Sequence, residues 1–176
     1  AGSGLLLLPW LHGAQAAATD GWPADARVPG GVARLSLGPA AERPQAFAGD
    51  IPLLVLGDAI EWTALVGIPL SAPTGAAEIR LHTASGPRSI PYTVRDKKYS
   101  EQRLKVAPKT VDLSAADNAR YERERDHQQT VMATFSTPLP AQMQLPVPVP
   151  GRRSSSFGLR RVFNGQSRNP HSGMDI

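Results

Sequence analysis

The sequence contains no cysteine. This absence excludes a disulfide framework, a thiolate metal site and a cysteine nucleophile, so any chemistry must come from histidine, carboxylate or hydroxyl side chains. It does not fix the cellular compartment, since many exported domains lack disulfides. Long apolar runs are lacking as well, because none reaches the roughly 18 residues that a transmembrane helix needs. The sequence therefore predicts no stable transmembrane segment.

Aromatic residues are scarce, at 6% of 176 residues, and no run of Lys or Arg is interleaved with them. Nucleic acid would therefore find no stacking platform, and we exclude it as the expected partner. The net charge is +4 and the isoelectric point is about 9.8. This mild excess of positive charge favours a polyanionic partner, such as an anionic membrane surface or an acidic envelope polymer.

The first residues resemble an export signal. An apolar stretch, residues 5–11, runs into small residues with an Ala-Gln-Ala pattern at 14–16, which is the order of the apolar region and cleavage site of a secretory signal peptide. The basic region that should precede them is missing, and a linker followed by an irregular arm is the alternative. We interpret residues 1–18 as the remnant of a signal peptide, which predicts an exported protein of the periplasm or cell envelope.

Short apolar segments bounded by Gly and Pro follow, as in "GGVARLSLG", "IPLLVLGD", "WTALVGIPLSAPTG", "AEIRLHTASG" and "RSIPYTVRD". Each has the length of a strand, with partial two-residue alternation, and turn signals recur every 8–12 residues or so. The fold class expected is mainly β, with a small antiparallel β-sandwich-like domain over residues 28–107. His82 falls inside one of these segments, and we interpret it as an ordinary strand residue.

The sequence that follows has the pattern of a single helix. Ser114 with Asp117 three residues later is typical of an N-cap, and no Gly or Pro occurs from Ala115 to about Phe135. The spacing predicts a linking helix over residues 111–136. Its middle is charged on nearly all sides, which indicates solvent exposure or a spacer between domains, and His127 is expected to be solvated there.

Alternating prolines predict an extended connector over residues 137–156. Within it, Arg152 and Arg153 could meet an anionic ligand, although an exposed basic pair is the plainer interpretation. The chain restarts at residues 157–176, with too few residues for a core of its own. We expect this tail to be extended or loosely docked on the β domain.

The tail holds a possible metal pair, His171 and Asp175. Pro170 and Gly173 disfavour a helix, and in an extended strand the two Cα atoms would lie roughly 13 Å apart, too far to share an ion. A turn at Ser172–Gly173 removes that difficulty, and glycine permits the positive φ that such a turn can require. An imidazole and a carboxylate form a reasonable partial zinc shell.

The whole stretch "FGLRRVFNGQSRNPHSGMDI" resembles the opening of the zinc metallopeptidase family M23, the LytM or lysostaphin-like endopeptidases of bacterial peptidoglycan. The shared pattern is F-G-x-R, then N-G, then R-x-P-H-x-G-x-D. Upstream segments such as "VPGGVARLSLG" and "YTVRDKKYSEQRLKVAPKTVDLS" are similar to the N-terminal β domain that precedes the peptidase in many M23 proteins. The resemblance covers nearly all of residues 28–176.

The resemblance implies that His171 and Asp175 are the first two ligands of a catalytic Zn²⁺. The family's later H-x-H motif, which supplies the third ligand and the catalytic histidine, would lie beyond Ile176, so the catalytic residue is unknown here and the chain is expected to be truncated and inactive. The implied substrate is the peptide cross-link of peptidoglycan. Arg168 and Asn169 could position that substrate, and Arg160 and Arg161 lie beside them, but packing or turn formation explains all four equally well.

Two further hypotheses remain open. The protein could be a non-catalytic envelope regulator that activates an amidase through an M23-like domain, although the presence of both His171 and Asp175 argues against a degenerate site. The β domain could also shield the peptidase cleft until a partner, such as an envelope regulatory protein, displaces it.

Overall fold

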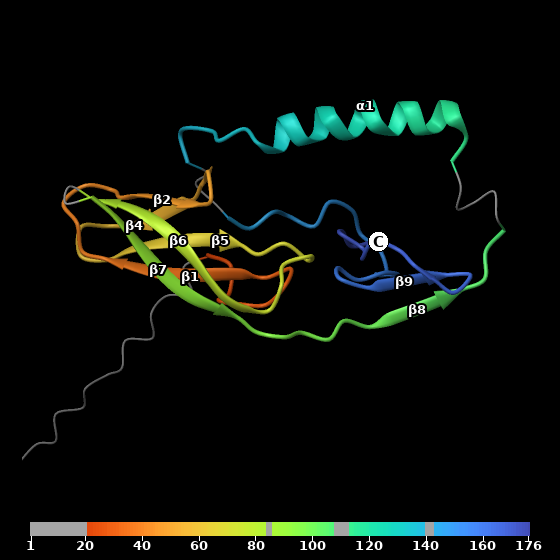
Figure 1. Ribbon diagram of the computed structural model, residues 1–176, viewed down its shortest axis with the longest axis horizontal. Coiled ribbons are helices and arrows are strands. Elements are labelled where there is room, and N and C mark those ends of the chain that lie inside the picture. Colours follow the sequence, from red (N-terminus) through yellow and green to blue (C-terminus); the bar gives the residue numbers. More distant parts are fainter. Residues whose placement is uncertain (1–20, 84–85, 108–112, 140–142) are drawn as a thin grey trace, which may run out of the picture.

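The computed structural model describes residues 21–83, 86–107, 113–139 and 143–176, and the predicted signal segment, residues 1–18, lies outside them. The chain is mainly β, as predicted (Figure 1). Its elements are β1 (Val32–Gly38), β2 (Gln45–Ala48), β3 (Ile51–Pro52), β4 (Leu54–Gly57), β5 (Trp62–Gly67), β6 (Gly75–Thr83), β7 (Gly86–Val94), β8 (Glu101–Leu104), α1 (Ala115–Met132), β9 (Arg160–Phe163) and β10 (Gln166–Ser167).

Two antiparallel sheets build the N-terminal domain. One has the strand order β1-β5-β4 and the other β3-β2-β6-β7, with an unbroken ladder between β6 and β7 from Gly75↔Val94 to Thr83↔Gly86. Buried positions alternate along the strands, as Ala33, Leu35 and Leu37 do in β1. This period of two places one face of each sheet against the other, so that the apolar side chains form a single core.

Helix α1 lies apart from both sheets (Figure 1). Ser114 is its N-cap and accepts a hydrogen bond from the backbone N–H of Asp117, as the sequence indicated. None of its residues is buried, and the ion pair Arg120–Glu124 along its surface is exposed. Within the described residues, no helix is both long and apolar enough to cross a membrane.

The C-terminal tail is more ordered than the sequence predicted. Strands β9 and β10 form a hairpin closed by Asn164 and Gly165, whose φ angles of 51° and 83° are those of a two-residue turn. Strand β8 then pairs with β9 in parallel, from Glu101↔Arg160 to Leu104↔Phe163. The expectation of an extended or loosely docked tail was wrong, because β8, in the segment that follows the sandwich, pairs with the tail as an edge strand.

A close contact joins the sandwich to this third sheet. The Tyr99 hydroxyl donates a hydrogen bond of 2.7 Å to the backbone carbonyl of Pro29, and its ring packs against Gly158. Gly30 packs against Leu70, Phe157 and Tyr99 so closely that a Cβ there would come within 2.6–2.8 Å of each of them. Two glycines, Gly30 and Gly158, thus allow the third sheet to approach the sandwich closely. This packing fixes the tail beside the sandwich.

Asn164 also ties the tail to the linker after β8. Its side chain accepts from the Val106 N–H at 3.0 Å and donates to the Val106 carbonyl at 2.9 Å. Replacing Asn164 by Ala removes both bonds and places an alanine, which lacks a stabilising side-chain hydrogen bond, in the left-handed region. We therefore expect the free energy of β8–β9 pairing to fall by about 1–2 kcal/mol. Hydrogen exchange of the Arg160 amide, which donates to Ser100 at the other end of the pair, measures this loss.

Asn164→Gly is the matched control. It removes the same two bonds but tolerates a positive φ, so the protection of the Arg160 amide should fall less than in Asn164→Ala. The Leu53 amide, which donates to Ala46 within the sandwich, should exchange at the same rate in all three proteins. Equal protection of Arg160 in the native protein and in Asn164→Ala would show that this side chain does not hold the pair together.

Candidate metal site in the C-terminal segment

Backbone hydrogen bonds hold His171 and Asp175 beside residues 155–159, the segment that leads into β9. The Gly158 N–H donates to the His171 carbonyl at 2.7 Å, and the His171 N–H donates to the Leu159 carbonyl at 2.9 Å. Asp175 and Ser155 form an isolated antiparallel bridge, in which the Asp175 N–H donates to Ser155 at 3.2 Å. Both ends of the pair are therefore anchored to the same neighbouring segment.

The chain bends at Gly173, between the two anchors. The sequence predicted a turn there, with a positive φ as one way for glycine to make it. Gly173 does not use that region, and a Cβ built on it would lie at an ordinary 4.0 Å from the His171 ring. The bend is imposed by the backbone bonds on either side of it rather than by the special freedom of glycine.

The two side chains approach one another. His171 Nε2 lies 3.3 Å from Asp175 Oδ1, with side-chain exposures of 13% and 51%. By distance this is an ion pair if the imidazole is protonated, but the geometry does not make a hydrogen bond, and Nε2 stays buried without a partner in the described part of the chain. The unmet hydrogen bond of Nε2 requires an explanation, since buried polar atoms in proteins almost always have a partner.

A shared metal ion is one such explanation. Nitrogen and oxygen ligands bound to a tetrahedral zinc at their usual distances lie roughly 3.4 Å from each other. The Nε2···Oδ1 distance of 3.3 Å agrees with that separation. The pair fits two corners of a zinc site.

Arg161 holds the other oxygen of the carboxylate. Its Nη2 lies 3.5 Å from Asp175 Oδ2 and 3.2 Å from Ser155 Oγ. The two oxygens of Asp175 are thus divided, with Oδ2 toward the guanidinium and Oδ1 toward the imidazole. Metal-binding carboxylates are commonly oriented in this way by a second hydrogen-bonded group, so Arg161 orients the predicted ligand.

The remaining candidates of the tail lie around this pair. Arg168 donates from Nη2 to Gln166 at 3.0 Å, while its buried Nε has no partner among the described residues. Asn169 is exposed. Arg160 lies 3.8 Å from Glu101 of β8, so its side chain pairs with the neighbouring strand of the sheet. A role for Arg168 and Asn169 in substrate binding stays a prediction.

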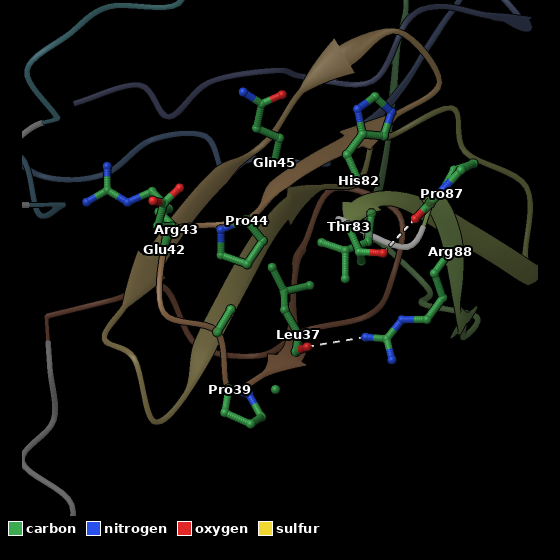
Figure 2. A pocket seen from close by; sticks show the side chains of 14 residues that line it. Leu37, Pro39, Glu42, Arg43, Pro44, Gln45, His82, Thr83, Pro87 and Arg88 are labelled. Carbon is green, nitrogen blue, oxygen red and sulfur yellow. Dashed lines mark hydrogen bonds between the residues drawn. The ribbon is translucent and has the colours of Figure 1, made fainter.

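Another cleft lies in the sandwich, where the ends of β6 and β7 meet the loop before β2 (Figure 2). It has a volume of about 780 Å³ and is lined by residues 37–40 and 42–45 and by the ends of β6 and β7. His82 borders it with its ring 4.8 Å from the Phe47 ring, and Arg88 donates to the Leu37 carbonyl. Sequence reasoning gave no sign of this cleft, because loops and strand ends far apart in the chain form it.

Across residues 21–83, 86–107, 113–139 and 143–176, no group of three or more His, Cys, Asp or Glu side chains could hold a metal. His127 is exposed on α1, and His82 lies in the sandwich. A catalytic zinc needs three protein ligands and an open position for water. His171 and Asp175 therefore make up at most part of a catalytic shell.

Comparison with known proteins identifies the N-terminal domain. Residues 25–97 match the model of the peptidase family M23 N-terminal domain, which covers the two-sheet sandwich. By this match the chain carries an M23 N-terminal domain, and we call it the M23 chain. A crystal structure of a candidate peptidase M23 from Pseudomonas aeruginosa is similar to the M23 chain, with 33% sequence identity and a TM-score of 0.61.

That similarity covers 76% of the M23 chain and 52% of the Pseudomonas aeruginosa protein. The M23 chain therefore spans about half the length of the solved structure that it matches. The matched share exceeds the sandwich alone, which agrees with the family resemblance seen in the sequence on both sides of α1. The comparison with curated proteins gave no match.

Proposed function

We propose that the M23 chain contributes two ligands, His171 and Asp175, to the zinc site of an exported endopeptidase that hydrolyses peptide cross-links of bacterial peptidoglycan. The observation that carries the proposal is the 3.3 Å spacing of Nε2 and Oδ1 without a hydrogen bond between them. The family match supports a peptidase, and the positive net charge suits an anionic envelope polymer.

In that mechanism the residues of this chain would bind the ion and orient its ligands. His171 Nε2 and Asp175 Oδ1 would hold the ion, and the backbone bonds from Gly158 and to Leu159 fix the imidazole. Arg161 orients the carboxylate through Oδ2. Zinc, when bound, supplies a Lewis acid for the scissile carbonyl and lowers the pKa of its water. A third ligand and a proton-transferring histidine are expected from an H-x-H motif outside this sequence.

Digestion of purified peptidoglycan sacculi tests the proposal. We expect a chain extended to the length of the solved relative to release peptides, to lose this activity after treatment with a chelator, and to regain it when Zn²⁺ is added back. Mg²⁺ added at the same concentration should not restore activity, because it prefers octahedral oxygen ligands.

A well-folded extended chain that releases no peptides with Zn²⁺ would overturn the endopeptidase assignment. The regulatory hypothesis would then take its place, and the close packing of Tyr99 and Phe157 around Gly30 would be the first surface to examine. Activity that survives complete removal of metal would instead contradict the zinc mechanism alone.

A further inference from the structure

A groove lies between the linker that leaves the sandwich and the segment that enters β9. It has a volume of about 370 Å³ and is lined by residues 98–100 on one side, by residues 153–157 on the other and by Leu159. The backbone bond from the Arg160 N–H to the Ser100 carbonyl, 2.8 Å long, holds its two walls together. Two parts of the chain that are more than 50 residues apart therefore build one surface.

The lining of the groove is positively charged. Lys98 and Arg153 supply one cation from each wall, four serines supply hydroxyl groups, and no acidic side chain takes part. In the described parts of the chain neither cation makes an ion pair. Glu101, the acidic residue just beyond this stretch of linker, lies 2.7 Å from Arg103 and 3.8 Å from Arg160, so it is already engaged. The lining is complementary to an anion with hydrogen-bond acceptors, such as a carboxylate.

The groove borders the candidate metal pair through Ser155. Ser155, which lines the groove, bonds to Asp175 through its backbone and accepts from Arg161 through Oγ. Arg161 is the residue that orients the Asp175 carboxylate. An extended peptide seated over the pair could thus place a neighbouring acidic residue in the groove.

We propose that this groove is a subsite for a free carboxylate of the peptide substrate, with Lys98 and Arg153 as its specificity-determining cations. The inference rests on the proposed function for the identity of the substrate, but not for the binding itself. It gives the linker of the N-terminal domain a direct part in recognition, which a purely shielding domain would not have.

Peptide binding to the 176-residue chain tests the subsite without metal or hydrolysis. The probe is a fluorescently labelled peptidoglycan stem tripeptide with free carboxylates, and fluorescence anisotropy at low ionic strength gives its Kd. We expect Lys98→Ala and Arg153→Ala each to raise the Kd about two- to fivefold, as expected for the loss of one solvent-exposed ion pair, and Lys98→Arg to retain binding. The same tripeptide with its carboxylates amidated should bind much more weakly.

Two variants serve as matched controls. Arg152→Ala and Lys105→Ala remove the same charges from positions that do not line the groove, and they should leave the Kd unchanged. Equal weakening by the controls would reduce the site to a diffuse basic surface and overturn the proposal. Equal binding of the amidated tripeptide, or equally strong competition by inorganic phosphate, would overturn it as well.

This experiment separates the two proposals. If the variants weaken binding as expected while the extended chain hydrolyses nothing, the peptide subsite stands and the endopeptidase assignment falls. If the extended chain is an active zinc enzyme but Lys98→Ala and Arg153→Ala bind the tripeptide normally, the enzyme assignment stands and the subsite is wrong.

Discussion

Replacing His171 by alanine should abolish peptidoglycan hydrolysis by the extended M23 chain. The substitution removes a predicted zinc ligand whose Nε2 is buried and lacks any hydrogen-bond partner in the described structure. Changes to groups that merely orient a metal ligand cost about 10–100-fold in affinity or activity. Loss of the ligand itself should exceed that, so we expect a decrease of more than about a hundredfold in the rate of peptide release.

His127→Ala is the control for this substitution. His127 is exposed on α1, far in sequence from the candidate site, so its removal should leave the rate unchanged. Circular dichroism of both variants should match that of the native chain, which separates loss of chemistry from loss of fold. A His171→Ala protein that digests sacculi at the native rate would remove His171 from the mechanism.

Replacing Gly158 by alanine should have the largest effect on the stability of the C-terminal segment. Gly158 has φ of 82°, and a Cβ there would lie 2.1 Å from Tyr99 Cε1. The backbone strain and the clash together should cost about 2–4 kcal/mol. Because residue 158 also donates to the His171 carbonyl, the damage should reach the metal pair. Hydrogen exchange of the His171 amide measures it directly.

Gly165→Ala distinguishes the clash from the backbone strain. Gly165 has nearly the same φ, 83°, but nothing lies within 4 Å of its Cβ position. It should therefore cost only about 1 kcal/mol, the penalty of the left-handed region alone. If both variants lower the protection of the His171 amide equally, the packing of Tyr99 against Gly158 does not fix the tail.

The sandwich could be predicted from sequence because its signals are local. Alternating apolar residues and regular turns predicted strands, and the structure places Ile79 and Leu81 of β6 in the core while Arg80 and His82 face outward. The same is true of the N-cap at Ser114. Each of these features depends on residues within one or two turns of chain.

The pairing of β8 with β9 could not be predicted, because β8 has no strand pattern in its sequence and its partner strand is distant along the chain. The sequence of β8 is "EQRL", and all four residues are exposed, so no apolar alternation distinguishes it from a loop. Its partner lies more than 50 residues away and runs in parallel. The groove beside this pairing could not be predicted for the same reason. The sequence indicates Arg153 only as one member of an exposed basic pair.

The candidate pair itself was found through a motif, and its geometry only through the fold. Spacing alone left His171 and Asp175 up to 13 Å or so apart, and the bridge to Ser155 brings them together. The third ligand was predicted to lie beyond Ile176, and the described residues offer no group of three.

The zinc content of the extended chain is the decisive measurement for the proposed metal site. After dialysis against Zn²⁺ and then against metal-free buffer, elemental analysis should find one zinc per native chain and much less than one in His171→Ala. Equal zinc content in the two proteins would contradict the account, because the ion would then be held without the imidazole.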